Sequence, residues 1–503
     1  MVELTGRDLT LQTVNSVVRG GARTDLSPAA HPQMEASRQV VRDLVAAGQP
    51  VYGVNTGFGD LASQRIEESD TRSLQERLLL SHAAGVGKPL PDEVVRAMLL
   101  LRANALARGY SGVRIELVER LLDFLNKGLL PLVPRKGSVG ASGDLAPLAH
   151  LALPIIGRGK VRVNGEVREA AEALASAGLE PLVLEPKEGL ALINGTQAMT
   201  ASLALSALDG DVLLRLADLI GALSTDAFRG TDSCFDARVH ELRPHPGQIA
   251  SAANLWQLLQ GSEIRESHRV GDLRVQDPYS FRCMPQVHGA ARDVLTETVR
   301  KLEIEMNAAT DNPLIFDHPG DVIAAGNFHG EPMAMAADFL AIALAEIGGI
   351  SERRIEKLTY PAFSNLPAFL VEDAGLNSGF MLAHVTAAAL ASENKGLAHP
   401  ASIDSIPTSA DKEDHVSMGQ TAALKLRRTV RNVRRILAIE LLAGCQAVEF
   451  LRPLRTSEEL EGVHARVRQA VPMWREDRIM ADDIHTAEML LAESGAELVS
   501  SIS

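Results

Sequence analysis

A run of small residues at 137–144, Gly-Ser-Val-Gly-Ala-Ser-Gly-Asp, has the composition to do chemistry with its own backbone. Its three glycines allow a positive φ or the close approach of another group. If the chain bends tightly, the amide nitrogen of Gly143 can reach the carbonyl carbon of Ala141, and ring closure releases water. Loss of the Ser142 hydroxyl as a second water would leave an exocyclic methylidene, a strong electrophile. A phosphate-binding loop fits poorly, because neither G-x-G-x-x-G nor a following Gly-Lys-Ser/Thr is present.

A second set of chemically capable side chains lies at three-residue intervals just before a predicted long helix. Gln276, Tyr279 and Arg282 would bring an amide, a phenol and a guanidinium together at that point of the chain. The guanidinium of Arg282 could bind a carboxylate through two parallel hydrogen bonds. A surface loop with an ordinary ion pair agrees about equally well with the spacing alone.

Four further residues are candidates whose local sequence favours a structural role. Tyr52 lies among glycines, where an aromatic ring often packs beside a turn, and His82 is an isolated histidine next to an apolar helix. Asn194 precedes a helical pattern and is interpreted as its N-cap. Glu413 belongs to the charged run 407–419, which would form either a solvated helix start or a polar wall facing a substrate.

The sequence contains no pattern typical of metal binding or of a disulfide framework. His-Gly-Glu at 329–331 has the H-x-E order of a zinc deaminase, but the P-C-x-x-C partner is absent, and no H-E-x-x-H occurs. The three cysteines, Cys234, Cys283 and Cys445, are widely spaced, which suits a reducing compartment. A net charge of −14 argues against a nucleic-acid-binding surface. We therefore expect neither a metal ion nor a nucleic-acid partner.

The composition and the N-terminus predict a cytoplasmic globular protein with no membrane span. Hydrophobic residues make up 46% of the chain and charged residues 23%, which is typical of a globular protein with a large core. The first residues include an acid, Glu3, and lack the apolar segment of a secretory signal. The most apolar stretch, 333–350, is interrupted by Asp338 and Glu346, so a transmembrane helix is not expected.

The first part of the chain, 1–195, is predicted to be a domain of shorter helices, loops and a small hairpin that carries the glycine-rich loop. Hydrophobic periodicity predicts helices at 36–47, 71–84, 91–108 and 113–127, and a further helix that starts after an N-cap at Asp144. The alternating segment 160–167, with Asn-Gly at its centre, predicts a β-hairpin.

The second part, 196–503, is predicted to be a bundle of long helices with a helical tail. The helical segments are expected at 196–228, 286–309, 331–358, 375–398 and 412–451, with the tail at 455–500. Helices of this length in a soluble chain usually bury their apolar stripes on partners, so we expect a homo-oligomer. The fold class is therefore mainly α.

Eight motifs, in one order along the chain, resemble those of the aromatic amino acid ammonia-lyases, and of the histidine ammonia-lyases among them. They are YGVNTGFG, LLLSHAAGVG, GSVGASGDLAPLAH, LINGTQAM, VQDPYSFRCMPQVHG, ATDNP, GNFHGEP and TSADKEDHVSMG. The resemblance implies a long-helix bundle of the aspartase/fumarase-like lyase type and a homotetramer whose active sites take residues from more than one subunit. It also implies a methylidene-imidazolone (MIO) group, formed autocatalytically from Ala141-Ser142-Gly143, with no external cofactor.

The resemblance further implies a reaction, the non-oxidative deamination of L-histidine to trans-urocanate and ammonia. In that reaction Tyr52 would be the base for the β-proton, or a close participant. Arg282 would hold the substrate carboxylate, and the remaining catalytic residues would hydrogen-bond the MIO oxygen or the substrate: Asn194, Gln276 and Tyr279.

The remaining substrate-binding residues implied by the resemblance are Phe328, which would pack near the MIO, and His82 and Glu413, which would contact the imidazole ring. A carboxylate that accepts a ring N–H would select imidazole over phenyl. The chain departs from the usual pattern just before Glu413, where Asp411-Lys412 stand in place of Asn-Gln. This departure keeps the glutamate and changes the charges beside it.

Two alternatives to histidine deamination remain open from the sequence. Within the family, the chain would be a tyrosine or phenylalanine ammonia-lyase, or an aminomutase. In a different class, it would be a catalytically inactive helical scaffold that keeps the fold and not the catalyst.

Overall fold

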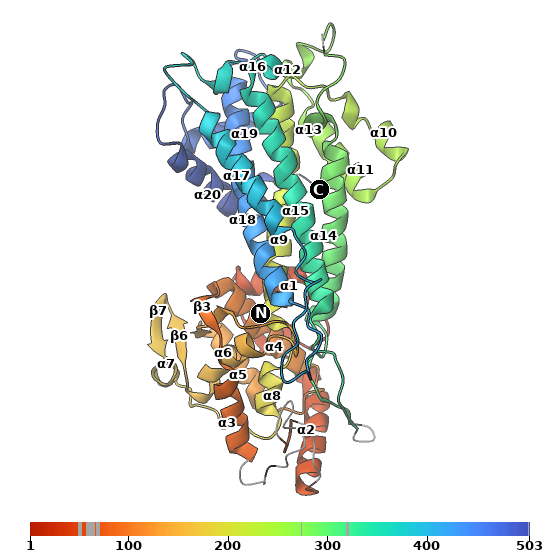
Figure 1. The fold of residues 1–503 in the computed structure, drawn as a ribbon, viewed down its shortest axis with the longest axis vertical. Helices are drawn as coiled ribbons and strands as arrows, with labels where there is room; N and C mark the ends of the chain where they lie inside the picture. Colours follow the sequence, from red (N-terminus) through yellow and green to blue (C-terminus); the bar gives the residue numbers. More distant parts are fainter. Residues whose placement is uncertain are drawn as a thin grey trace. The chain divides into compact units, whose positions relative to one another are not determined.

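The computed structural model describes residues 1–48, 53–56, 66, 71–272, 274–317, 321–500 and 502. Most of these residues are helical and the strands are short, which confirms the mainly α class (Figure 1). The chain divides into two compact units. Unit 1 comprises Met1–Leu205, Val299–Asp338 and Pro400–Leu424, and unit 2 comprises Ser206–Thr298, Phe339–His399 and Lys425–Ser503.

Unit 1 contains the shorter helices. They are α1 (Leu11–Val18), α2 (His31–Ala46), α3 (Thr71–His82), α4 (Asp92–Ala107), α5 (Ile115–Asn126), α6 (Leu145–Ala152), α7 (Ala170–Ser176) and α8 (Glu188–Ile193), with 3-10 turns at Pro28–Ala30 and Leu153–Ile156. The helices predicted from periodicity in this part of the chain are all present, with ends that differ by a few residues.

The strands pair only in small local sheets. They are β1 (Val2–Leu4), β2 (Thr24–Leu26), β3 (Val86–Pro89), β4 (Leu130–Pro131), β5 (Pro134–Lys136), β6 (Lys160–Val163), β7 (Glu166–Glu169), β8 (Leu314–Ile315) and β9 (Val322–Ile323). β1 and β2 are parallel, whereas β3–β5, β4–β6–β7 and β8–β9 are antiparallel. The predicted hairpin is confirmed as β6 and β7, joined by Asn164 and Gly165, both with positive φ.

The core of unit 1 is built on α4, whose residues from Ala97 to Ala107 are all buried. α5 packs against it with the predicted stripe, which is buried at Leu117, Val118, Leu121, Leu122 and Leu125. Because one face of α5 is apolar at helical spacing, burial of that face against α4 stabilises both helices.

Unit 2 contains most of the length of four long helices, and each of these helices has one end assigned to unit 1. The long helices are α9 (Gln197–Ala227), α14 (Met284–Met306), α15 (Glu331–Thr359) and α18 (Gly419–Glu449), and the shorter ones are α10 (Ala237–Glu241), α11 (Pro246–Leu258), α12 (Glu263–Glu266), α13 (Tyr279–Arg282), α16 (Pro361–Ser364), α17 (Met381–Leu397), α19 (Glu458–Ala470) and α20 (Met480–Leu498). Two 3-10 turns lie at Ser233–Phe235 and Ala368–Leu370.

Two helix predictions in the second part of the chain were wrong at their N-terminal ends. The helix expected from 375 begins at Met381, because the N–H groups of Ser378 and Gly379 donate to Asp477 instead, at 2.7 and 2.9 Å. The helix expected from 412 begins at Gly419, after a turn with positive φ at 409–411.

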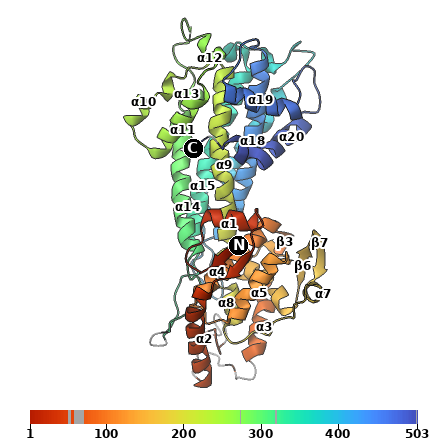
Figure 2. The same ribbon diagram turned by 180° about the vertical axis from the view of Figure 1, so that it is seen from behind.

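The predicted tail 455–500 is two helices, α19 and α20, which end and begin on either side of Pro472. Proline lacks the N–H that a continuing helix would use. Both helices lie beside α18 (Figure 2), and ion pairs join them to it. Arg435 of α18 pairs with Glu488 of α20 at 3.1 Å, and Glu449 of α18 accepts from Arg468 of α19 at 2.9 Å.

One helix in the described part of the chain, α15, is long and apolar enough to cross a membrane by length and composition. However, 61% of its most apolar window is buried inside the protein, as expected of a core helix. The buried acid Asp338 within this helix accepts two backbone N–H groups, from Ala401 and Ser402, both at 2.7 Å.

The two units interleave along the chain, since unit 1 takes up 299–338 and 400–424 in addition to its N-terminal segment. The predicted division into an N-terminal domain, 1–195, and a long-helix bundle with a helical tail, 196–503, stays a prediction. What matters for function is that unit 1 holds the glycine-rich loop together with residues far from it in sequence.

Candidate functional site

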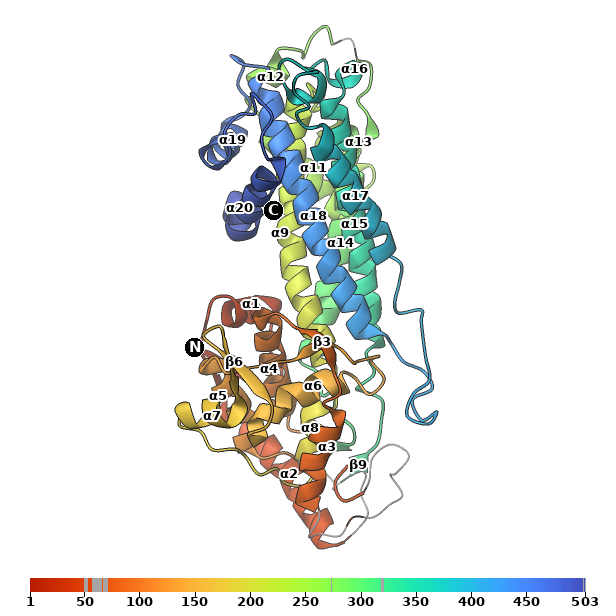
Figure 3. The same ribbon diagram turned by 60° about the vertical axis from the view of Figure 1, so that its left-hand side comes forward.

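Three helices of unit 1 position the glycine-rich loop and two of the other candidates. α3, α6 and α8 pack on one another (Figure 3). His82 is the last residue of α3, the loop 137–144 leads directly into α6, and Asn194 follows the last residue of α8. Their packing therefore gathers segments that are more than 100 residues apart in the sequence.

Gly143 lies against Gly195, and this contact fixes the end of the loop. The two residues form an isolated parallel bridge, and the N–H of Asp144 donates to the Gly195 carbonyl at 2.7 Å. Gly143 has φ +72, and a Cβ built on it would lie 2.1 Å from the Gly195 oxygen. A residue with a side chain cannot take this position without moving the backbone, so the close approach predicted for the loop is confirmed at this glycine.

Asp144 is not the capping residue that its sequence position predicts. It stands just before α6, but its carboxylate makes no bond to the first turn of that helix. The carboxylate accepts instead from the Ser138 hydroxyl and from the N–H of Met199, each at 2.8 Å. Met199 belongs to the first turn of α9, where N–H groups have no partner within the helix. Asp144 therefore ties the loop to α9, and its complete burial raises its pKa to about 6.

Ser142 contacts Glu413, which is 271 residues further along the chain. The Ser142 hydroxyl donates to Glu413 Oε1 at 2.6 Å. The other carboxylate oxygen accepts from the hydroxyl groups of Thr408 and Ser409, both at 2.9 Å. Glu413 is therefore held by a turn in which Thr408 and Glu413 exchange backbone hydrogen bonds. The candidate leaving hydroxyl and the candidate imidazole-binding carboxylate thus lie side by side.

The sequence predicted that Asn194 is the N-cap of the following helix. In the structure it is instead the residue that ends α8. Its side chain is buried, and its Oδ1 has no hydrogen-bond partner among the described residues. Buried amide oxygens are rarely left without a partner, so this atom is a place where a bound group would be stabilised.

His82 and Phe328 are both half-buried. Nδ1 of His82 lies 2.9 Å from the Leu78 carbonyl, which can only accept, so Nδ1 carries the proton in this bond. Burial lowers the pKa of His82, and the Leu78 carbonyl and the charge of Glu413 act in the opposite direction. The residue after Phe328, His329, stacks on the ring of His415 with centroids 5.9 Å apart.

Gln276, Tyr279 and Arg282 form a cluster in unit 2, as their spacing predicted. Arg282 donates from Nη2 to Gln276 Oε1 and from Nε to the Asp277 carbonyl, both at 3.0 Å. Its guanidinium carbon lies 4.6 Å from the centre of the Tyr279 ring, and the tyrosine is 70% exposed. The Arg282 guanidinium therefore contacts both the Gln276 amide and the Tyr279 ring, just before α14.

The remaining candidates are Tyr52, which lies outside the described residues, and Ala141, which is buried directly before Ser142. Among the residues that the structure describes, no three His, Cys, Asp or Glu side chains are grouped so that they could hold a metal ion.

The roles of three buried charges in unit 1 were not predicted from the sequence. Arg102 donates to the Asn194 carbonyl at 2.9 Å, and Lys187 pairs with Asp311 at 2.6 Å; all three charged side chains are nearly inaccessible to solvent. The only available signal was a charged residue within an apolar helical run, as at Arg102 in α4.

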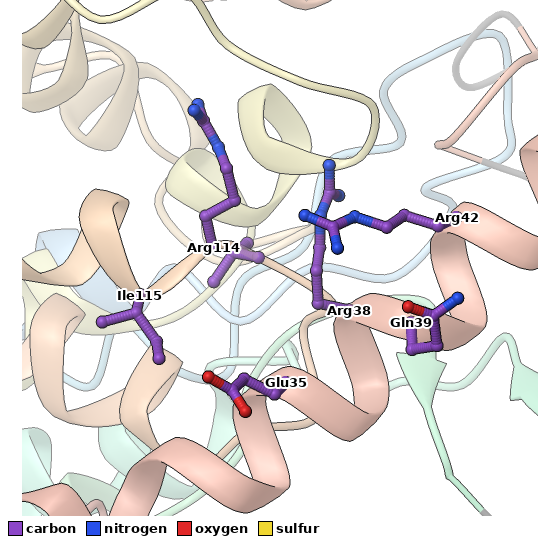
Figure 4. A pocket seen from close by; sticks show the side chains of 7 residues that line it. Glu35, Arg38, Gln39, Arg42, Arg114 and Ile115 are labelled. Atoms are coloured by element: carbon purple, nitrogen blue, oxygen red, sulfur yellow. The ribbon is translucent and has the colours of Figure 1, made fainter.

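A separate pocket of about 360 Å³ lies between α2 and the start of α5 (Figure 4). It is lined by Glu35, Arg38, Gln39, Arg42, Val113, Arg114 and Ile115. Arg38 donates to the carbonyls of Gly112 and Pro186, and Arg114 pairs with Glu188 at 2.8 Å. These two arginines are thus engaged in holding the unit together, and none of the candidate catalytic residues lines this pocket.

Comparisons with known proteins support the long-helix fold. Residues 9–469 match the sequence profile of aromatic amino acid lyases. The chain is 53% identical to a histidine ammonia-lyase of Koribacter versatilis, with 97% of each chain covered. It is 45% identical to the crystal structure of histidine ammonia-lyase from Trypanosoma cruzi, with 100% and 95% coverage and a TM-score of 0.92. Tyrosine aminomutase from Streptomyces globisporus gives 38% identity, 100% and 99% coverage and a TM-score of 0.94.

Fold and relatives together define a helical carbon–nitrogen lyase. The sequence profile covers most of the chain, and relatives above 50% identity extend over nearly its full length. The chain belongs to the aromatic amino acid lyase family.

Proposed function

We propose that this protein is an ammonia-lyase that converts L-histidine into trans-urocanate and ammonia. The observation that carries the proposal is the contact between Ser142 and Glu413, 2.6 Å apart, in a loop whose Gly143 lies against Gly195. One contact joins the residue with a leaving hydroxyl to the carboxylate suited to an imidazole N–H. The likeness to two histidine ammonia-lyases, from Koribacter versatilis and Trypanosoma cruzi, supports histidine as the substrate.

The residues of the loop fit an MIO group. In its formation, the Gly143 nitrogen bonds to the Ala141 carbonyl carbon, and that carbonyl oxygen leaves as water with the amide protons of Gly143 and Ser142, which leaves a double bond between the Ala141 carbon and the Ser142 nitrogen. The Ser142 hydroxyl then leaves with its Cα proton as a second water. Gly143 has no side chain to block the attack, and the partnerless Oδ1 of buried Asn194 offers a polar group beside the bridge. When formed, the MIO supplies an electrophilic carbon that no ordinary side chain provides.

The chain's own residues would bind and orient the amino acid. Arg282 would hold the substrate carboxylate, and Gln276 and Tyr279 would hydrogen-bond the MIO oxygen or the substrate. Tyr52 would take the β-proton, which requires surroundings that activate its phenol, because an unperturbed tyrosine is protonated at neutral pH. Glu413 would accept the imidazole N–H.

Phe328 and His82 complete the proposed set. Phe328 would exclude water from the reacting groups, and His82 would contact the imidazole ring through its Nε2, because Nδ1 is engaged by the Leu78 carbonyl. The Asn194 side chain would donate from Nδ2 to the MIO oxygen, or accept an N–H of the substrate at its buried Oδ1, and only the second bond would satisfy that oxygen.

Processing of tyrosine is the second candidate, because the chain is also similar to tyrosine aminomutase from Streptomyces globisporus. Glu413 favours histidine, because a phenyl or phenol ring would leave this carboxylate without a ring N–H to accept. The discriminating assay compares formation of urocanate with formation of coumarate, cinnamate or a β-amino acid. Coumarate or a β-amino acid without urocanate would overturn the choice of histidine.

Intact-protein mass spectrometry of the purified chain and of a Ser142→Ala variant tests the catalytic proposal. The chain should be lighter than its sequence by two waters, and the variant should lack the hydroxyl-derived loss. We expect the variant to remain folded and its turnover to fall by about 10³-fold or more, because it lacks the electrophile. An unmodified mass in the original chain would support an inactive scaffold, and undiminished turnover of Ser142→Ala would contradict the MIO.

We also propose a cytoplasmic homotetramer with active sites shared between subunits. The proposal rests on the family resemblance and on long helices with exposed apolar residues, such as Phe339 and Leu382. Light scattering should give about four times the 53.9 kDa chain mass. A monomer that forms urocanate at full rate would overturn the shared site, and recovery outside the cytoplasmic fraction would overturn the compartment.

A further inference from the structure

Arg102 is a fully buried arginine on α4 whose hydrogen bonds go to neutral groups. Its Nη1 donates to the Asn194 carbonyl at 2.9 Å and to Gln197 Oε1 at 2.7 Å. Among the described residues, no carboxylate forms an ion pair with it. Burial lowers its pKa to about 10, against the opposing charge of Asp311, so it remains a cation at neutral pH. Burying a cation costs folding free energy unless the charge is paired and hydrogen-bonded, so an arginine buried without an ion pair calls for an explanation.

The two acceptors of Arg102 lie at the ends of the short segment between α8 and α9. Gln197 is in turn fixed by its Nε2, which donates to the Thr310 hydroxyl at 2.9 Å. The segment 194–197 is thus clamped from α4 on one side and from residue 310 on the other. Because a hydrogen bond to a charged donor is stronger than a neutral one, Arg102 is the firmest of these restraints.

Gly195 makes room for this clamp. It has φ +154, and a Cβ built on it would lie 2.5 Å from Arg102 Nη1 and 2.7 Å from the Thr310 hydroxyl oxygen. The absence of a side chain lets the guanidinium approach the backbone. The same glycine offers its carbonyl to the N–H of Asp144 and bridges Gly143.

Arg102 is therefore connected to the glycine-rich loop indirectly, through the backbone of Asn194 and Gly195. Its guanidinium holds the carbonyl of Asn194, and the next residue, Gly195, holds Gly143 and Asp144. The Asn194 side chain, with its partnerless buried Oδ1, is carried by the same restrained backbone. No residue given a role by the family resemblance supplies this restraint.

We propose that Arg102 is a positioning residue that fixes the 194–197 segment, and through it both the cyclising backbone at Gly143 and the amide of Asn194. The inference rests on the proposed function, because it concerns maturation and turnover of the same site. Ring closure needs the Gly143 nitrogen within reach of the Ala141 carbonyl carbon, and a displacement of about 1 Å is enough to slow such a step strongly.

The test is an Arg102→Met variant of the full-length chain, which keeps the side-chain volume and removes the charge and donors. We expect part of the folded protein to keep its unmodified mass. The matured fraction should have a kcat about 10- to 100-fold lower, the loss of one hydrogen bond to a charged group, with KM little changed. Arg102→Lys should recover part of both losses, because it keeps the charge and one donor direction.

Arg96→Met is the matched control, because Arg96 lies on the same helix and also donates to carbonyls, those of Val17 and Val18, both at 3.2 Å. It should mature completely and turn over at the original rate. A merely structural role for Arg102 would lower stability and leave the folded protein fully matured with the original kcat. That result would overturn the inference.

Gln197→Leu decides the matter if Arg102→Met does not fold, since it removes one acceptor of Arg102 and leaves the Asn194 carbonyl. A smaller loss of maturation and kcat would support the inference, and full maturation with the original kcat would overturn it. Failure of the proposed function is visible separately, because the unsubstituted chain would then show no loss of two waters. That outcome would overturn the inference as well.

Discussion

The region around Gly143 and the partly exposed cluster around Arg282 both hold candidate catalytic residues, but they are stabilised in different ways. Around Gly143, the loop depends on partners from distant segments, as Ser142 does on Glu413 and Asp144 on Met199. Around Arg282, the contacts come from one seven-residue stretch, and Tyr279 is 70% exposed. In the first region water cannot replace a lost partner, whereas in the second it can.

A substitution should therefore change different properties in the two regions. Removing a buried polar group leaves its partner without a hydrogen bond or an opposite charge, so folding and function fall together. Removing an exposed group leaves a partner that water can solvate, so only binding of the substrate should suffer. Substitutions at Lys187, Asp144 and Arg282 test this contrast.

Lys187→Met should have the largest effect on stability. Lys187 Nζ lies 2.6 Å from Asp311, and both side chains are at most 1% exposed. The variant leaves Asp311 buried without its partner, which costs about 3–5 kcal/mol of folding free energy. Thermal melting at one protein concentration should show the loss, and the double variant Lys187→Met/Asp311→Asn should recover much of it.

Lys160→Met is the control for this prediction. Lys160 pairs with Glu169 at 3.4 Å, but the two side chains are 56% and 59% exposed. An exposed ion pair of this kind contributes at most about 1 kcal/mol, so the melting temperature should hardly move. Equal losses in the two variants would contradict the contrast between buried and exposed groups.

Asp144→Asn should change how stability depends on pH. Burial raises the Asp144 pKa to about 6 from 3.8, so the folded state binds this proton more tightly than the unfolded state. The resulting stability is fully present below pH ~4 and is lost as pH rises through ~6, a loss of about 3 kcal/mol.

The asparagine has no proton to lose in this range, and its amide can keep bonds to Ser138 and Met199. The difference in melting temperature between variant and original chain should therefore shift in favour of the variant between pH 4 and pH 7. A difference that stays constant over this range would show that Asp144 is not held in a shifted state.

The two regions also differ in what the sequence could predict. Gln276, Tyr279 and Arg282 were expected to meet because their spacing is local, and the family motifs identified the residues of the glycine-rich loop. The contacts of that loop could not be predicted, because they join Ser142 to Glu413 and Gly143 to Gly195 across long stretches of chain.

Local patterns failed where a distant group offered a better partner. Asp144 has the sequence of a helix cap, but the free N–H of Met199 in α9 takes its carboxylate. Helical periodicity likewise continues back from Met381 towards 375, where Asp477 binds the backbone instead. Arg102 carried no signal beyond a charge within an apolar run, since its role depends on a carbonyl 92 residues away.

Arg282→Lys should have the smallest effect on stability and still impair function. Lysine keeps the charge but loses the planar pair of donors that matches a carboxylate, so KM for the amino acid should rise about 10- to 100-fold. The melting temperature should fall less than in Lys187→Met, because Arg282 is only half-buried and its partners come from one short stretch of chain that water can reach. Arg238→Lys, at an 87% exposed arginine side chain of the same unit, should change neither quantity. A large loss of stability in Arg282→Lys would place this cluster with the buried region, and an unchanged KM would remove Arg282 from the substrate site.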